Sequence, residues 1–309
     1  MEKTHAAGTP ADKWVDRIRL IDVDTGEIHE ATGDLLGPAP ERFGVRALFK
    51  TPPEQAAIEE TVAALNEFLV SFCGREPVTV DPERIHILTR EEFCAKVGVA
   101  RPDTALGKSW FGHVYLWRGW PLWLFQSVLA HELFHNIAYF WVDVRTKPET
   151  AADGLRLPIF LQRRMGLVLR DPSFHTLLPH FHGLDEGATE MAAIVIRQII
   201  AKKSRLLDDE GRRSIKAFMF SPPLTAFADR LVTAAVGAGG SIMETLKKIF
   251  LDCLNGTDDF LAQLETRLPG ATEVLRRTGS RPDELLPAAE ELGFSDLDAI
   301  IRPYIDAAK

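Results

Sequence analysis

The chain has 309 residues, of which 46% are hydrophobic and 26% are charged, a composition typical of a globular protein with a sizeable core. Its formal net charge is −8, and no block of lysine and arginine forms a phosphate-binding stripe, so nucleic acid is not an expected partner. The three cysteines lack Cys-x-x-Cys spacing, and the polar N-terminus lacks the apolar run of a secretory signal. These features argue against a disulfide framework and a thiolate metal site, and they predict a cytoplasmic protein.

The first hundred residues predict short strands and helices in alternation. Residues 17–31, RIRLIDVDTGEIHEA, alternate as two strands around an Asp-Thr-Gly turn. Apolar residues recur at helical spacing over residues 53–74, and Gly74 provides a natural stop. RIHILT, at residues 84–89, alternates as a strand should, and REEFCAKVG, at residues 90–98, predicts a short helix.

Residues 120–142, WPLWLFQSVLAHELFHNIAYFWV, have about the length of a bilayer span. Polar and ionisable residues lie near the middle of this segment, where they are costly in lipid unless they face a protein interior. No second segment of comparable hydrophobicity follows to shelter them. We therefore expect a buried helix and consider membrane association unlikely, and we keep a metal-free helical protein associated with a membrane as the less favoured interpretation.

Beyond this segment the sequence predicts helices almost to its end, separated by glycine- and proline-rich breaks. We predict an α+β fold that is mostly helical. A small mixed β/α N-terminal subdomain carries the central helix, an all-helical C-terminal subdomain follows, and a cleft lies between them. The predicted boundaries are residues 1–40 for an N-terminal extension with a short hairpin, 41–185 for the first subdomain and 186–309 for the second.

The central helix contains the motif His-Glu-Leu-Phe-His. His131 and His135 are four residues apart, so a helix places both imidazoles on one face, within reach of one ion. Glu132 lies roughly a quarter turn aside, next to the open side of such a metal, where its carboxylate can take a proton from water. A lone buried histidine is usually a core residue, but three polar groups on one buried helix all need partners.

A catalytic zinc takes three protein ligands and leaves a fourth position for water, so a third ligand must come from elsewhere in the chain. The segment HFHGLDEGATEMAAIVIRQII carries Glu186 and Glu190 at the start of another predicted helix. They are also four residues apart, and one helix turn presents both carboxylates in the same direction.

Together, HELFH and LDEGATE resemble the gluzincin metallopeptidases, in which His-Glu-x-x-His is followed on a later helix by a zinc-binding glutamate. The resemblance implies that His131, His135 and Glu186 bind zinc (Zn2+), that Glu132 is the general base, and that Glu190 orients a ligand imidazole. The reverse assignment, with Glu190 as the ligand and Glu186 as the helper, stays open. The long gap after His135 implies an insertion with its own helix over residues 155–170, LRLPIFLQRRMGLVLR.

The resemblance also implies an edge strand before the metal-binding helix, on which a bound peptide pairs in antiparallel fashion. GHVYLW, at residues 112–117, is at the right place, and its Gly112, His113, Val114 and Tyr115 are candidate substrate contacts. An ordinary core strand is the other interpretation of this pattern.

Most enzymes of this kind add a Tyr, His or Arg that donates to the oxyanion of the transition state. The candidate donors are His180, His182, Tyr139 and Tyr304. Each also has a plainer interpretation, as a surface residue or as helix packing.

We therefore expect a zinc-dependent peptidase that hydrolyses peptide bonds in peptides or proteins, with Glu132 as general base. The alternative is a catalytically degenerate zinc-binding protein that works as an interaction module. The extended metzincin motif is missing, because Ala138 and Trp141 occupy the positions of its glycine and third histidine.

Overall fold

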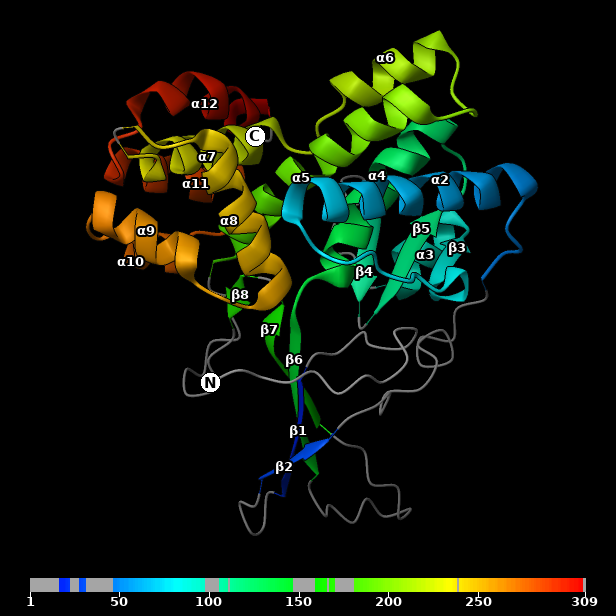
Figure 1. Cartoon of the computed structure of the whole chain (residues 1–309), viewed down its shortest axis with the longest axis horizontal. Helices are drawn as coiled ribbons and strands as arrows, with labels where there is room; N and C mark the ends of the chain where they lie inside the picture. Colours follow the sequence, from blue (N-terminus) through cyan, green and yellow to red (C-terminus); the bar gives the residue numbers. More distant parts are fainter. Residues whose placement is uncertain are drawn as a thin grey trace.

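The computed structural model describes residues 17–22, 28–31, 47–97, 106–110, 112–146, 159–165, 167–169, 181–237 and 239–307. This part of the chain is mostly helical and contains two sheets (Figure 1), which confirms the expected α+β, mostly helical class. The elements, in chain order, are β1 (Arg17–Asp22), β2 (Ile28–Ala31), α2 (Pro52–Phe68), η1 (Leu69–Cys73), η2 (Pro82–Arg84), β3 (Ile85–Leu88), α3 (Arg90–Lys96), β4 (Gly107–Trp110), β5 (His113–Trp117), α4 (Leu122–Ile137), β6 (Phe140–Thr146), β7 (Ile159–Met165), β8 (Val168–Leu169), α5 (His182–Lys203), α6 (Asp209–Ala217), α7 (Pro222–Ala235), α8 (Ile242–Asn255), α9 (Asp259–Arg267), α10 (Ala271–Arg277), α11 (Pro282–Glu291), η3 (Ser295–Leu297) and α12 (Asp298–Ala307).

The expected central helix is α4, and it is buried. Leucine, valine, alanine and phenylalanine dominate its sequence, and it packs against α2, α5 and the strands β4 and β5. The helix ends at Ile137, because Ala138 is extended at φ −63° and ψ 153° and the chain enters β6 at Phe140. Within the described ranges, no helix combines the length and the apolar character needed to cross a membrane.

A three-stranded sheet with the order β3-β5-β4 lies under α4. β5 pairs in parallel with β3 and antiparallel with β4. The expectation that residues 112–117, including Gly112, His113, Val114 and Tyr115, form an edge strand is therefore wrong, because both edges of β5 are already paired. Among the described strands, β4 is the edge of this sheet nearest to α4.

A second sheet was not expected. β6 and β7 pair with each other, and β1 pairs in parallel with β6, giving the order β2-β1-β6-β7-β8. This sheet projects from the helical body (Figure 1). The helix predicted over residues 155–170 is wrong, since its described part forms β7 and β8. The predicted N-terminal hairpin is present as β1 and β2, but it belongs to one sheet with the segment that follows α4.

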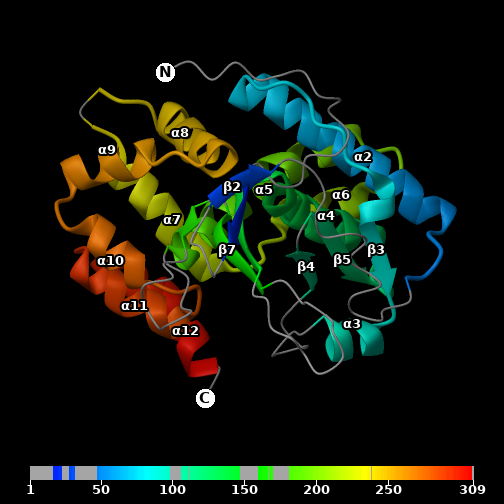
Figure 2. The same ribbon diagram turned by 90° about the horizontal axis from the view of Figure 1, so that it is seen from below.

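The helices after residue 181 pack around α5 and α7 (Figure 2). Phe181, which precedes α5, adopts a left-handed conformation with φ 60° that costs a side chain about 1–2 kcal/mol. Its ring is buried and its backbone N–H donates to the carbonyl of Arg276. The N–H of Gly183 donates to Thr278, and its missing side chain admits the carbonyl of Gly279. The start of α5 is thus fixed by the turn between α10 and α11.

The three-stranded sheet has a polar pair on the face turned away from α4. Val114 and Leu116 join the main core, so His113 on the same strand faces the opposite side. His86 Nε2 and His113 Nδ1 are 2.8 Å apart, and the ring centroids are 5.1 Å apart with an interplanar angle of 20°. The distance between the centroids is about the N···N distance plus the distance from each ring centre to its bonded nitrogen. The two rings therefore meet end to end in nearly one plane, which is the geometry of a linear hydrogen bond.

This pair predicts a loss of stability in mild acid. Burial lowers the pKa of His86 to about 4, and neighbouring His113 adds to the effect. The unfolded chain keeps a pKa near 6.5, so it binds more protons than the folded chain between those two values, and stability falls as the pH drops from about 6.5 to about 4. Between pH 7 and pH 5, the free energy of unfolding of the natural protein should fall by about 2 kcal/mol more than that of His86→Gln, as measured by urea unfolding. An unchanged pH profile would contradict this assignment.

Candidate metal centre

Two helices bring together three side chains that could hold a metal ion. α4 presents His131 and His135 on one face, and the second turn of α5 presents Glu186 opposite them. The Oε2 atom of Glu186 lies 3.5 Å from Nε2 of His131 and 3.5 Å from Nε2 of His135. Two ligand atoms at about 2.05 Å from a tetrahedral zinc are roughly 3.3 Å apart, so this donor set and spacing fit a zinc ion.

His131 is held from behind by a carboxylate. Its Nδ1 lies 3.2 Å from Oε2 of Glu190. Arg197, two turns further along α5, donates to the other oxygen of this carboxylate at 2.6 Å, and both residues are 1% exposed. The backbone N–H of Phe220 donates to the same oxygen at 2.9 Å. Glu190 thus orients His131, and Glu186 rather than Glu190 reaches both Nε2 atoms.

Two side chains of α5 also lie next to His135. Its Nδ1 lies 3.6 Å from Oδ2 of Asp185 and 3.4 Å from the hydroxyl oxygen of Thr189. The other oxygen of Asp185 accepts the backbone N–H of Leu167 at 2.8 Å. Leu167 lies in the turn between β7 and β8, and its side chain is buried in the main core. The second sheet therefore reaches the group that supports His135.

The pKa values show how strongly these groups interact. Burial by itself lowers the pKa of His131, but hydrogen bonds with Glu186 and Glu190 outweigh burial and raise this pKa to about 10. Burial raises the pKa of Glu186, but the two histidines outweigh it and hold its pKa well below the usual range. Two imidazoles facing one buried carboxylate need a positive charge between them, and either protons or a metal ion can supply it.

Glu132 lies beside the edge strand β4. The backbone N–H of Ser109 donates to its carboxylate. Gly107 makes this approach possible, because a Cβ atom there would lie 2.8 Å from Cγ of Glu132 and 2.7 Å from a methyl group of Val128. Burial raises the pKa of Glu132, and His131 and His135 oppose this shift without cancelling it. A carboxylate with a raised pKa is a better proton acceptor for catalysis near neutral pH.

The linker between α6 and α7 covers one face of His131. The ring of Phe220 lies 4.7 Å from the imidazole, at an interplanar angle of 33°. Phe218 contacts Phe220 edge-on at 5.2 Å and Trp123 at 5.9 Å. All three aromatic rings are half-buried, so an apolar surface leads from the metal-binding residues to solvent.

The expected oxyanion donors differ in how close they lie to Glu186. His182 is near the centre, with Nδ1 at 3.9 Å from Oε1 of Glu186. Tyr139 packs over the backbone at Gly256, where an added Cβ would lie 2.5 Å from its ring. Tyr304 is 42% exposed on α12, a helix that packs on α7 and α11. His180 lies outside the described residues, so His182 is the described candidate closest to the metal-binding residues.

Comparison of the chain with protein-family models, with curated proteins and with solved structures gave no match.

Sequence reasoning missed three residues that support the centre. Arg197 follows Glu190 by seven positions, a spacing that places both on one face of a helix, so the pair was detectable in principle. Asp185 is part of the LDEG segment, but its link to His135 depends on how α4 and α5 cross. The approach of Gly107 to Glu132 depends on strand pairing and carries no local signal.

The buried pair of Arg197 and Glu190 gives a prediction about stability. Arg197→Met leaves the Glu190 carboxylate buried without its cation, which we expect to cost about 3–5 kcal/mol in urea unfolding. The double variant Glu190→Gln with Arg197→Met removes both charges and should recover a large part of this loss. Equal losses in the single and the double variant would show that the charge pair is not the cause.

The close approach of β4 predicts that Gly107→Ala disturbs Glu132 while leaving the metal-binding residues in place. Under the peptidase function proposed below, we expect hydrolysis of an unstructured protein to fall at least about tenfold, with zinc content unchanged and a stability loss of about 1–3 kcal/mol from overpacking. Ser109→Ala is the matched control, since it keeps the backbone N–H that donates to Glu132. If Gly107→Ala retains full activity, β4 does not position Glu132.

Proposed function

We propose that the protein is a zinc-dependent peptidase of the gluzincin type that hydrolyses peptide bonds in peptides or proteins. The observation that supports this proposal best is the convergence of His131, His135 and Glu186 with the carboxylate of Glu132 alongside. The donor set of two imidazoles and one carboxylate suits zinc and leaves a fourth position for water. Glu190 lies next to Nδ1 of His131 and Thr189 next to Nδ1 of His135, which leaves both Nε2 atoms for a metal.

Zinc, when bound, would lower the pKa of a water molecule to about 7 and polarise the scissile carbonyl. The protein supplies the remaining steps. Glu132 would accept the proton of the attacking water and pass it to the leaving amine. His182, next to Glu186, is the described residue best placed to donate to the oxyanion.

The strand β4, rather than β5, lies at an edge of the described sheet, where a bound peptide could pair. Its outer side faces Glu132, and an extended peptide that added to this edge would bring a scissile bond next to that carboxylate. We propose that such a peptide pairs with β4. The N-terminal β/α subdomain with α4 and the helical subdomain from residue 186 onward would form the two walls of the cleft. A cytoplasmic location remains part of the proposal.

The test separates metal binding from catalysis. Glu132→Gln keeps the three metal-binding residues, so we expect about one zinc per chain by elemental analysis. Without a base to accept the proton, hydrolysis of an unstructured protein should fall about 100-fold or more. Glu91→Gln, an exposed glutamate on α3, is the control and should change neither quantity.

Each outcome has a clear meaning. Retained cleavage in Glu132→Gln would refute the proposed role of this residue. Bound zinc without hydrolysis of any peptide by the natural protein would favour the catalytically degenerate, zinc-binding interaction module. Absence of bound metal after purification without chelator would refute both interpretations.

A further inference from the structure

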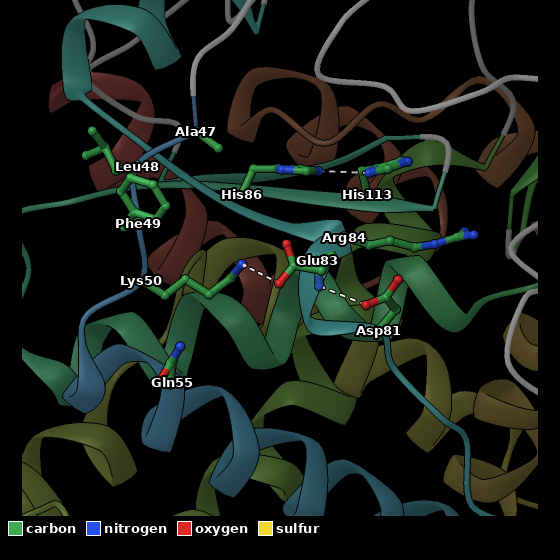
Figure 3. Close-up of a pocket in the computed structure, with 10 residues that line it drawn as sticks. All are labelled: Ala47, Leu48, Phe49, Lys50, Gln55, Asp81, Glu83, Arg84, His86 and His113. Atoms are coloured by element: carbon green, nitrogen blue, oxygen red, sulfur yellow. Dashed lines mark hydrogen bonds and ion pairs between the residues drawn. The ribbon is translucent and has the colours of Figure 1, made fainter.

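A cavity of about 580 Å³ opens on the side of the three-stranded sheet turned away from α4 (Figure 3). Residues 47–50, which precede α2, line it together with residues of η2 and with His86 and His113 from β3 and β5. The metal-binding residues lie on the opposite side, because α4 packs against the other face of this sheet. The cavity is therefore separate from the candidate metal centre and does not depend on the proposed peptidase activity.

His86 brings an unused polar atom into this cavity. The residue is 6% exposed, and its Nε2 is bonded to His113. Its Nδ1 has no hydrogen-bond partner among the described residues. The low pKa of His86 leaves the imidazole uncharged at neutral pH, so Nδ1 can act as a donor or an acceptor according to the tautomer. A polar ring on a nearly buried residue that lines a cavity and has a nitrogen without a partner points to a ligand.

Lys50 is the second group in the cavity that lacks a good partner. Its side chain is only 14% exposed, and the nearest carboxylate in the described structure, that of Glu83, is 3.9 Å away. This distance is too long for a hydrogen bond. The side chain of Glu83 is itself 89% exposed, so it can turn to water at little cost. The ammonium of this mostly buried side chain carries three donors and would gain from an additional acceptor.

The charges around the cavity balance, with Lys50 and Arg84 against Asp81 and Glu83. Asp81 is engaged in accepting the backbone N–H of Glu83 at 2.9 Å. An entering anion therefore meets no excess of negative charge. In Figure 3 the ammonium of Lys50 lies toward Glu83 and the ring of His86 toward His113, whereas Arg84 extends away from Lys50 and His86.

We propose that this cavity binds a small organic oxyanion, a carboxylate or a phosphate monoester, between the ammonium of Lys50 and the Nδ1–H of His86. An anion selects the tautomer in which His113 donates to Nε2 of His86 and the proton of His86 resides on Nδ1. The cavity is far larger than an inorganic ion, since one water molecule takes about 30 Å³. The apolar part of the ligand would contact Leu48 and Phe49, whose ring is 96% exposed.

The experiment follows the imidazole ¹⁵N resonances of His86 in the full chain, assigned from their loss in His86→Gln. Phenyl phosphate, N-acetylphenylalanine and inorganic phosphate are titrated separately. We expect a saturable shift of the His86 resonances with phenyl phosphate or with N-acetylphenylalanine, and the tighter of the two identifies the natural anionic group. Inorganic phosphate should bind more weakly, because it lacks the apolar part.

Two variants test the role of Lys50. Lys50→Met should weaken binding at least about tenfold, because a charge-assisted hydrogen bond is lost. Lys203→Met, which removes an exposed lysine paired with Glu67, is the matched control and should bind as the natural protein does. Glu83→Gln removes the competing carboxylate and should bind more tightly.

The proposal is overturned if neither organic anion gives a saturable shift, or if Lys50→Met and Glu83→Gln both bind with unchanged affinity. Urea unfolding of Lys50→Met checks that the variant is folded. If Lys50→Met is not folded, the affinity of Glu83→Gln decides the question, because Glu83 is exposed and its replacement leaves the core intact.

Discussion

Two helices, α4 and α5, cross in the core and carry ionisable side chains into an apolar interior. Burying a charge without a partner costs several kcal/mol, so each of these groups must be matched by another. Arg197 matches Glu190, Glu190 holds His131, and the Asp185 carboxylate lies 3.6 Å from Nδ1 of His135. This chain of pairs leaves the two Nε2 atoms facing Glu186, and the arrangement of the rest of the molecule serves to keep these groups in place.

The supports come from distant parts of the sequence. The linker between α6 and α7 donates a backbone N–H to Glu190 and covers His131 with Phe220. The second sheet donates the N–H of Leu167 to Asp185, and the turn after α10 anchors the start of α5. Each support contacts Glu190, Asp185 or the start of α5, so segments far apart in the chain together set the positions of the side chains around His131 and His135.

The three-stranded sheet separates two different environments. On the side of α4, its edge strand lies against Glu132, and Gly107 allows the contact. On the opposite side, a hydrogen-bonded histidine pair and a mostly buried lysine line a cavity. The alternation of side chains along β3 and β5 produces this division, since neighbouring residues on a strand face opposite sides.

Elements with local signals can be predicted from the amino-acid sequence. The spacing of His131 and His135, the pair Glu186 and Glu190, and the strands β3 and β5 follow from helical and strand periodicity, which neighbouring residues encode. Contacts between distant segments establish that β5 is central, that β6 to β8 form a sheet with the N-terminal hairpin, and that Glu186 rather than Glu190 reaches both Nε2 atoms. The short apolar run from residue 155 suits a helix or a strand equally well, and pairing of β7 with β6 and β8 selects the strand. Arg197, Asp185 and Gly107 acquire their roles from contacts across elements, and no local pattern encodes those contacts.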